Sequence, residues 1–574
     1  MALGAVWFGI RSLLKVVRSD SAYLANQMAA VIAGEFEHSQ NYRLIEFVDL
    51  DFNLARLGAK PKERKQAPKL DVKLQPRQTP ENEMVDIETI DEEDYEAALN
   101  EQAGEAGEAA EARKDTSEPG EEIREIFRAY DIRGVVGETL TTEVIERIGL
   151  AIGTEAQDRG EKTLIVGYDG RVSSPTVSET LIEGLTASGC NVINIGMIPT
   201  PVLYFATHNS DTRSGVMVTA SHNPPDFNGF KIVINGKTLD GDDIEQIFDK
   251  FTTGDFATGS GSTTEIDITQ DYIDAITDDI VVAQPLKVVV DCGNGIAGNI
   301  APDLIESLGC DVVSLYCDVD GTFPNHMPDT SDPANLADLI QMVKAEEADL
   351  GIAIDGDGDR LVAVTDGGEI VWPDRLMMLF AKDVVSRNPG SDVVYDVKCT
   401  RHLNGVISNF GGRPIICRSG HSYIKAKVAE MNAILGGEMS GHICFRERWF
   451  GFDDGLYATA RLLEIVGSQS EGLGEMLAEF PKSVSTPEIH IRVKEAEKFA
   501  LIDKIVKSAD FGDASLTTID GVRADFASGW GLVRASNTGA SLTLRFEADD
   551  QSTLEQIQSL FREQLQIIDE KLDF

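Results

Sequence analysis

One short loop carries a serine whose neighbours suit phosphate chemistry. Ser221 lies in the run TASHNPP, where small residues and a rigid Pro-Pro turn present its hydroxyl for chemistry rather than for packing. A serine-hydrolase elbow needs glycine two residues to either side of the nucleophile, and Thr219 and Asn223 stand there instead. The loop therefore favours a phosphoryl carrier over an acyl-enzyme nucleophile. A solvated turn is the alternative interpretation.

Three carboxylates share a second loop. Asp355, Asp357 and Asp359 alternate with glycine (DGDGDR) between two apolar runs that predict buried strands. Carboxylates on such a tight turn can converge on one hard cation, and Mg²⁺ fits this arrangement best. A calcium EF-hand requires Gly at the sixth position and Glu at the twelfth, where this chain has Arg360 and Asp366. An acidic surface turn is disfavoured, because like charges between buried strands repel one another without a cation.

Two later loops carry groups that suit a sugar and a phosphate. The run GGEMSGH combines a carboxylate, a hydroxyl and an imidazole, which together can grip adjacent sugar hydroxyls. The run GLVRASNTG places a guanidinium, two hydroxyls and an amide around a turn, which suits a terminal phosphate. Each loop could also be a polar turn. The side chains concerned are Glu438, Ser440, His442, Arg534, Ser536, Asn537 and Thr538.

Five further side chains accompany these loops. Arg133 stands beside a glycine turn in the run FRAYDIRG, which also holds Tyr130, and from there it can reach a phosphate. Lys231 follows the serine by ten residues, close enough to neutralise a phosphoserine or to move a proton. Lys398 and His421 stand alone in the sequence. By default Lys398 would be a surface lysine, and His421 would be a histidine whose hydrogen bonds are made within the fold.

A repeated unit of strand, turn and helix must position these loops. Residues 163–167 predict a strand, followed by a polar turn and a helix that Ser174-Pro175 caps and begins. Further copies start at residues 287–291 and 393–396. Beyond Pro487 the pattern changes to short strands and a long final helix. The sequence therefore predicts an α/β protein with three related domains in series and a smaller C-terminal α+β domain.

The N-terminal part differs in composition from the rest. Residues 61–122 are rich in Asp and Glu with few large apolar side chains, which predicts a disordered acidic linker. Residues 1–60 form a small module with an amphipathic basic helix, for which we favour docking on a partner domain over peripheral membrane contact. The predicted domains span residues 123–266 with the serine loop, 267–369 with the aspartate loop, 370–482 with the sugar loop and 483–574 with the phosphate loop.

Overall composition narrows the class of protein. The formal charge of −45, from 96 acidic and 51 basic residues, argues against a nucleic-acid partner. Seven cysteines without a C-x-x-C pair indicate reduced thiols of the cytoplasm. No run approaches the roughly 18 apolar residues of a membrane span. We expect a soluble, cytoplasmic protein of several domains.

In their order along the chain, these motifs resemble those of the α-D-phosphohexomutase superfamily, and within it the bacterial phosphomannomutase/phosphoglucomutase group. The resemblance runs from about Ile126 to the C-terminus and does not cover the first 120 residues or so. It implies a heart-shaped assembly of three related α/β domains and a fourth domain related to the TATA-binding-protein fold. The chain departs from the usual pattern at Gly539-Ala540, which leaves the last phosphate contact open.

The resemblance also implies roles for individual residues. Ser221 would be the phosphoserine and would bind Mg²⁺ together with Asp355, Asp357 and Asp359. The reacting hydroxyl would be surrounded by Tyr130, Arg133, Lys231 and His421, with Lys398 and Arg360 positioning the substrate. Sugar hydroxyls would be held by Glu438, Ser440 and His442, and the non-reacting phosphate by Arg534, Ser536, Asn537 and Thr538. Lys231, Arg133 and His421 all remain candidates for the general acid and base.

The implied reaction is the reversible interconversion of hexose 1-phosphate and hexose 6-phosphate, with mannose and glucose both accepted. It would pass through a 1,6-bisphosphate, so that glucose 1,6-bisphosphate or mannose 1,6-bisphosphate is both intermediate and activator. We expect a monomer whose partners are small hexose phosphates. The alternatives are a haloacid-dehalogenase-type phosphatase with Asp355 as nucleophile, which leaves Ser221 without a task, and a catalytically idle scaffold that binds sugar phosphate.

Overall fold

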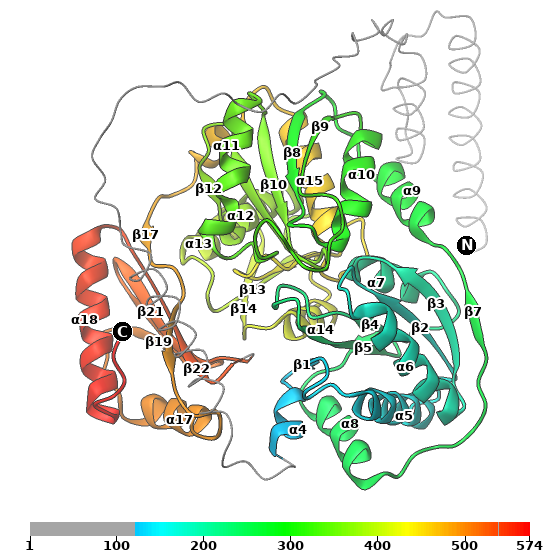
Figure 1. Ribbon diagram of the computed structural model, residues 1–574. Helices are drawn as coiled ribbons and strands as arrows, with labels where there is room; N and C mark the ends of the chain where they lie inside the picture. Colours follow the sequence, from blue (N-terminus) through cyan, green and yellow to red (C-terminus); the bar gives the residue numbers. More distant parts are fainter. Residues whose placement is uncertain (1–120, 538) are drawn as a thin grey trace, which may run out of the picture. The chain divides into compact units, whose positions relative to one another are not determined.

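The computed structural model describes residues 121–537 and 539–574, which belong to one compact unit, Ala112–Phe574 (Figure 1). The predicted N-terminal module, its amphipathic helix, the linker up to residue 120 and Thr538 lie outside the described residues. The described chain begins with helix α4 (Glu121–Ile126). Residues 121–122 are therefore helical, although the sequence predicted a linker through residue 122.

The first domain contains a mixed seven-stranded sheet. Its strands are β1 (Ile132–Val135), β2 (Thr163–Tyr168), β3 (Asn191–Met197), β4 (Gly215–Val218), β5 (Phe227–Ile234), β6 (Lys237–Thr238) and β7 (Thr263–Glu265). The order is β1-β5-β4-β2-β3-β7, with β6 beside β5. Strand β2 is parallel to β3 and β4, whereas β5 is antiparallel to β4 and β1. The helices of this part are α5 (Thr142–Asp158), α6 (Ser174–Ser188), α7 (Thr200–His208), α8 (Asp242–Thr253) and α9 (Thr269–Asp279).

Strand β2 is buried on both faces, which explains its unbroken apolar run. Leu164 and Val166 join the core formed with α5, α6 and α8, while Ile165 joins the core that contains α7. One detail of the predicted helix start is wrong. Ser173 is the N-cap of α6 and Ser174 is its first helical residue, whose hydroxyl donates to Asp169 Oδ1 over 2.5 Å.

The second and third domains each contain a smaller sheet. The second sheet has the order β12-β11-β10-β8-β9 and the third has the order β14-β13-β15-β16. Their strands are β8 (Lys287–Asp291), β9 (Asp311–Leu315), β10 (Leu350–Ile354), β11 (Leu361–Thr365), β12 (Ile370–Val371), β13 (Asp392–Asp396), β14 (Arg413–Cys417), β15 (Leu435–Gly437) and β16 (Ile443–Phe445). Their α-helices are α10 (Ala301–Ser307), α11 (Ala337–Ala345), α12 (Pro373–Arg387), α13 (His402–Asn409), α14 (His421–Met431), α15 (Gly455–Gly467) and α16 (Leu473–Leu477).

The fourth domain has a different architecture. Its strands are β17 (Val484–Ser485), β18 (Ile489–Arg492), β19 (Ser515–Thr517), β20 (Val522–Phe526), β21 (Gly529–Ala535) and β22 (Ser541–Ala548). All their pairings are antiparallel, and helices α17 (Lys498–Ser508) and α18 (Gln551–Ile568) contact the sheet (Figure 1). The prediction of three α/β domains followed by an α+β domain is thereby confirmed.

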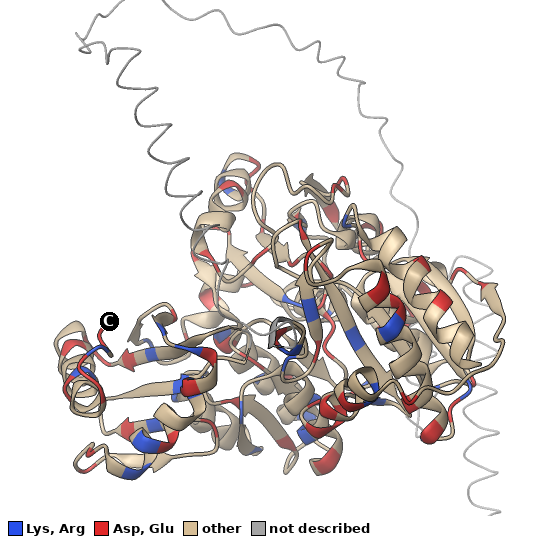
Figure 2. Ribbon diagram, turned by 60° about the horizontal axis from the view of Figure 1, so that its bottom comes forward, with Lys and Arg blue, Asp and Glu red and all other residues tan. Residues whose placement is uncertain are grey.

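A shared core joins the first three domains. Ile165 of the first sheet, Val288 of the second and Val393 of the third belong to one cluster of buried apolar side chains, whereas the fourth domain has a core of its own. Acidic and basic residues are interspersed over the described elements (Figure 2). Within the described residues, no helix is long and apolar enough to cross a membrane.

Candidate active site

The serine loop and the aspartate loop touch each other at the ends of two strand pairs. Ser221 lies between β4 and β5, and the aspartates lie between β10 and β11. The Ser221 hydroxyl donates a hydrogen bond of 2.7 Å to Asp355 Oδ2. Gly356 permits this approach, because a Cβ at that position would lie 2.4 Å from the carbonyl oxygen of Ser221. Ser221 itself has a φ of 51°, a left-handed conformation that a non-glycine residue adopts only when its surroundings enforce it.

Arg171 helps to hold the Ser221 backbone in this conformation. Its guanidinium group is buried and donates to the carbonyl oxygens of Ser221 and Asn223 at 2.7 Å each, and to those of Pro224 and Phe227. Asp169 holds the arginine through an ion pair of 3.2 Å and also accepts from the Thr219 hydroxyl. The serine loop is therefore tied to the end of β2.

Arg133 supports the other side of the same loop. It donates to the carbonyl oxygen of Ala220 at 3.0 Å and to Asn223 Oδ1 at 2.6 Å. Its Nε pairs with Asp131 at 2.7 Å, and both side chains are buried. Burial would lower the pKa of Arg133, but Asp131, Tyr130 and Asp357 together outweigh that effect and raise it, so the guanidinium is cationic beside the serine.

The three aspartates form a buried cluster of negative charge. Their carboxylates each offer an oxygen within 4.8 Å of the others, and none of the three residues is exposed. Burial and the two neighbouring carboxylates raise the pKa of Asp355 to about 8. Lys231 Nζ partly balances the charge, with ion pairs of 2.6 Å to Asp357 and 2.5 Å to Asp359.

The cluster fits a divalent cation. Asp357 Oδ1 is buried and has no hydrogen-bond partner among the described residues, which is a costly state for a carboxylate oxygen without a ligand. The donor set consists of hard carboxylate oxygens, with the Ser221 hydroxyl 2.7 Å from Asp355. The residues present could therefore hold a metal ion.

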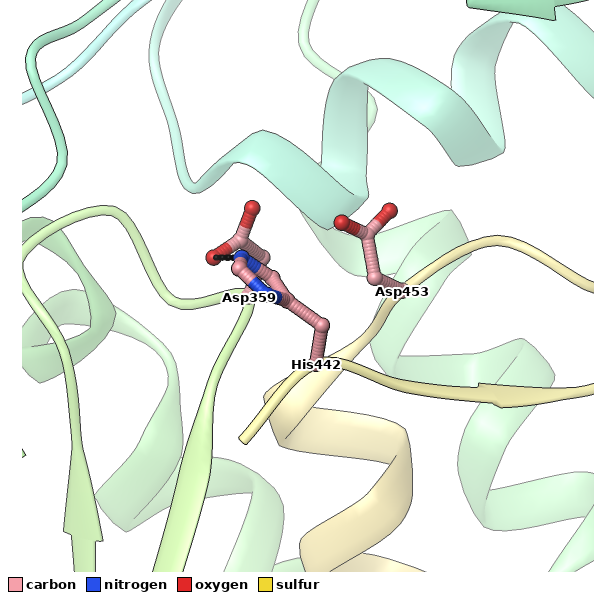
Figure 3. Close-up of side chains that lie close together, drawn as sticks. All are labelled: Asp359, His442 and Asp453. Carbon is pink, nitrogen blue, oxygen red and sulfur yellow. Dashed lines mark ion pairs between the residues drawn. The ribbon is translucent and has the colours of Figure 1, made fainter. Parts of the chain in front are cut away.

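A second group of potential metal ligands has another explanation. Asp359, His442 and Asp453 lie close together beside the aspartate loop, and an ion pair of 3.3 Å joins His442 Nε2 to Asp359 (Figure 3). Asp359 already pairs with Lys231, and Asp453 pairs with Lys425 at 2.7 Å. Because each carboxylate has an ammonium partner, the group serves as a charge network.

His421 begins helix α14 and faces this network. Its Nδ1 lies 3.2 Å from Asp453 Oδ2, its ring stacks on His442 at 5.1 Å, and Tyr130 meets it edge-on at 4.8 Å. Burial and Lys425 outweigh Asp453 and lower the pKa of His421 to about 4. The imidazole is therefore neutral at pH 7.

The sugar loop between β15 and β16 is held in place by its own contacts. Glu438 accepts from the backbone N–H of Gly420 at 2.5 Å and pairs with His442 Nδ1 at 3.0 Å. Burial would raise the pKa of Glu438, but His442, Lys398 and the Gly420 N–H together lower it to about 2. Burial would likewise lower the pKa of His442, but Asp359 and Glu438 raise it to about 9. Ser440 donates to Glu438 Oε2 at 3.4 Å, and Arg360 Nε lies 3.3 Å from His442 Nε2.

Cationic groups gather where the third and fourth domains meet. Lys398 pairs with Glu488 at 2.7 Å, and Arg534 pairs through Nε with Asp520 at 2.8 Å. Arg534 Nη2 is buried and has no hydrogen-bond partner among the described residues. Asn537 donates to the carbonyl oxygen of Ser419 at 2.8 Å.

A cavity of about 630 Å³ joins the sugar loop to these cations. It is lined by nine of the expected substrate-binding residues, namely Tyr130, Arg360, Lys398, Glu438, Ser440, His442, Arg534, Ser536 and Asn537. Ser221 is only 1% exposed and does not line the cavity. His222 lies between them, since it lines the cavity and its Nδ1 is 3.3 Å from Ser221 Oγ. The cavity and Ser221 are thus adjacent but separate in this structure.

Sequence reasoning missed several supporting residues. Arg171 and Asp169 appeared only as part of a turn, although paired charges beside an apolar strand are a signal for a buried ion pair. Asp453 follows an aromatic run and precedes a helix, which could have marked it as buried and functional. Asp520 had no local signal, because its partners Ser419 and Arg534 come from other parts of the chain.

Comparison with known proteins agrees with the phosphoryl-transfer class that the buried serine, the carboxylate cluster and the sugar-sized cavity define. Residues 124–258, 270–368, 372–484 and 488–564 match, in order, the phosphoglucomutase/phosphomannomutase alpha/beta/alpha domains I, II and III and the C-terminal domain. The chain belongs to the phosphoglucomutase/phosphomannomutase family.

Individual relatives support the same conclusion. A phosphomannomutase/phosphoglucomutase of Pseudomonas aeruginosa is 57% identical over 447 residues, which cover 78% of this chain and 96% of that protein. A phosphoglucomutase of Neisseria meningitidis is 49% identical over 446 residues, 76% of this chain and 96% of that protein. The crystal structure of a phosphoglucomutase/phosphomannomutase family protein from Burkholderia thailandensis superposes with a TM-score of 0.74 at 46% identity, over 78% of this chain and 98% of that one.

Proposed function

We propose that the protein reversibly interconverts hexose 1-phosphates and hexose 6-phosphates of mannose and glucose, with Ser221 as the phosphoryl carrier. The observation that carries the proposal is the 2.7 Å hydrogen bond from Ser221 to Asp355, which joins a hydroxyl nucleophile to a carboxylate cluster beside a sugar-sized cavity. The names of the relatives support both sugars.

The chemistry divides into two balanced steps. In the first, a hydroxyl oxygen of the sugar phosphate forms a bond to the phosphorus on Ser221, the bond from phosphorus to Ser221 Oγ breaks, and the hydroxyl proton passes to a base. This yields the 1,6-bisphosphate. After the sugar turns over, Ser221 Oγ forms a bond to the phosphorus of its other phosphate, the bond from that phosphorus to the sugar oxygen breaks, and the sugar oxygen takes back the proton from the base, which leaves the isomeric monophosphate and the phosphorylated serine. Glucose 1,6-bisphosphate or mannose 1,6-bisphosphate would thereby restore the phosphorylated enzyme.

The charges around Ser221 suit this transfer. Arg133 and Lys231 place two cations next to the serine and the aspartates, where charge on the moving phosphoryl group can be stabilised. We assign Asp355, Asp357, Asp359 and the serine as ligands of Mg²⁺, which when bound supplies further positive charge to the phosphoryl oxygens. Burial would lower the pKa of Lys231, but Asp357 and Asp359 raise it, so Lys231 is cationic and suits stabilisation of charge on the phosphoryl group. The neutral His421 suits the role of acceptor.

The cavity suggests how the sugar is held. Glu438 and Ser440 would accept and donate hydrogen bonds at adjacent hydroxyls, with His442 fixing the carboxylate. Lys398, Arg534, Ser536, Asn537 and Thr538 would hold the phosphate that does not react, and Tyr130 and Arg360 would line the path between the two ends. We retain the domain boundaries at residues 123, 267, 370 and 483 as a proposal, together with a cytoplasmic monomer that has no nucleic-acid partner.

A coupled assay with glucose 1-phosphate and mannose 1-phosphate, with and without glucose 1,6-bisphosphate, tests the proposal. We expect turnover of both sugars, stimulation by the bisphosphate, and loss of turnover in Ser221→Ala. Release of inorganic phosphate without isomerisation would contradict the proposal and favour the phosphatase with an Asp355 nucleophile. That alternative and the idle scaffold are not favoured, because the family match extends over all four domains.

A further inference from the structure

A single carboxylate oxygen links the fourth domain to the segment that leads into His421. Asp520 Oδ2 accepts a hydrogen bond of 2.8 Å from Arg534 Nε and another of 2.9 Å from the backbone N–H of Ser419. Ser419 and Gly420 directly precede His421, the first residue of α14. Asp520 therefore contacts, at one atom, the guanidinium at the cation-rich end of the cavity and the backbone beside the imidazole.

The local backbone explains how Asp520 reaches both partners. It lies in the turn between β19 and β20, next to Gly521, which has a φ of 74°. A Cβ at residue 521 would lie 2.1 Å from the carbonyl oxygen of Val533 and 2.7 Å from the Cα of Arg534. Glycine thus lets the turn lie directly against the strand that carries Arg534.

The bond to Asp520 also orients Arg534. With Nε occupied, the terminal amino groups are left for another acceptor, and Nη2 is buried without a hydrogen-bond partner among the described residues. A guanidinium held in this way can present its outer edge to phosphate oxygens.

The carbonyl group of Ser419 is also bonded to the fourth domain. Asn537 Nδ2 donates to the carbonyl oxygen of Ser419 at 2.8 Å, and the next N–H, that of Gly420, donates to Glu438. Both polar groups of the Ser419 backbone are therefore bonded to the fourth domain, two residues before His421, which faces Tyr130.

We propose that Asp520 is a positioning residue that fixes the phosphate-binding Arg534 and the Ser419–His421 segment relative to each other. The inference rests on the proposed function, because it assumes that the two ends of one hexose phosphate lie at these two places. Asp520 does not line the cavity, so it acts through its two partners rather than on the substrate.

Three variants test the proposal. Asp520→Ala removes both hydrogen bonds, Asp520→Asn keeps a neutral acceptor for them, and Asp549→Ala is the matched control. Asp549 also pairs with an arginine of the third domain, Arg401, but Asp549 is exposed and its bonded partner is not Ser419. We expect Asp520→Ala to raise KM for glucose 1-phosphate and to lower kcat, each by roughly fivefold or more, Asp520→Asn to recover part of both, and Asp549→Ala to match wild type.

A double-mutant cycle separates positioning from general stability. In the Arg534→Ala background we expect Asp520→Ala to have little further effect on KM, because the partner through which it acts is gone, while its effect on kcat through Ser419 persists. Effects on KM that simply multiply would overturn the proposal. So would wild-type constants in Asp520→Ala or, should that variant not fold, wild-type constants in Asp520→Asn.

The outcomes also distinguish this inference from the proposed function. A wild-type protein without mutase turnover would contradict the proposed function, and calorimetric binding of glucose 6-phosphate to the same variants would then still test Asp520. Equal affinity of wild type and Asp520→Ala for glucose 6-phosphate would refute the positioning role.

Discussion

The hydroxyl of Ser221 donates a 2.7 Å hydrogen bond to Asp355, so the serine of one domain is bonded directly to the aspartate loop of the next. Each loop connects two adjacent strands, and both strand pairs contribute side chains to one apolar core. The contact is therefore fixed by packing of the first and second domains, and it places the hydroxyl where a cation held by the aspartates would act on a phosphate.

The metal assignment predicts the effect of removing one charge from the cluster. Replacing Asp357 by Asn should weaken Mg²⁺ binding and raise the Mg²⁺ concentration needed for half-maximal activity by roughly tenfold or more. The exposed Asp366 in the next turn provides a control, since Asp366→Asn should leave the Mg²⁺ dependence unchanged. Equal activity of Asp357→Asn and wild type at limiting Mg²⁺ would refute the metal role.

The grip of the sugar loop predicts which hexoses are accepted. Mannose and glucose differ only at C2, so a site that holds O3 and O4 through Glu438 and Ser440 should treat them alike. Galactose is inverted at C4 and should leave a buried acceptor unpaired, which lowers catalytic efficiency by about 5- to 150-fold. The three hexose 1-phosphates are compared by kcat/KM. If galactose matched glucose, or if mannose were rejected as strongly as galactose, the proposed grip would be wrong.

The first 120 residues or so should be dispensable for catalysis. Matches to the family begin at residue 124, and the Pseudomonas aeruginosa relative is covered over 96% of its length by 78% of this chain. A protein that begins near Glu121 should therefore keep the steady-state constants of the full chain. A large loss of turnover on truncation would instead assign the N-terminal part a role at the active site.

Burial of His421 predicts a particular pH dependence of stability. Its pKa is about 4 in the folded protein against about 6.5 when unfolded, so between these values only the unfolded chain takes up the proton. The free energy of unfolding should accordingly fall as pH drops from 6.5 to 4, by at most about 3 kcal/mol from this residue. Thermal unfolding at several pH values should show a smaller loss in His421→Gln than in wild type. Parallel curves would contradict the shifted pKa.

Sequence alone predicted the elements better than it predicted the contacts between them. The apolar runs at residues 287–291 and 350–354, which predict strands, match β8 and β10. Short unbroken apolar runs bounded by glycine turns are typical of buried strands. The start of α6 was one residue off: Ser173 is the N-cap, and the hydroxyl of Ser174 donates to Asp169. The role of Asp520 could not be predicted, because it depends on a backbone group that is distant in sequence. The ion pair of Arg171 with Asp169 had a local signal, but the bond of Arg171 to the distant Ser221 carbonyl oxygen had none.

The burial of Ser221 was likewise not predicted. Its loop composition indicated an accessible hydroxyl, whereas the side chain is bonded to Asp355 and lies behind His222. A local pattern specifies a turn, but the depth of that turn depends on the neighbouring domain that packs over it.

Intact-mass measurement tests the central claim most directly. After incubation with glucose 1,6-bisphosphate, wild-type protein should gain the mass of one phosphoryl group, and glucose 6-phosphate should remove it again as turnover proceeds. Ser221→Ala should gain nothing and should lose most mutase activity while keeping its fold by circular dichroism, because truncation of a loop hydroxyl opens no core cavity. A wild-type protein that never carries the phosphoryl group, or a Ser221→Ala variant that turns over normally, would contradict the account.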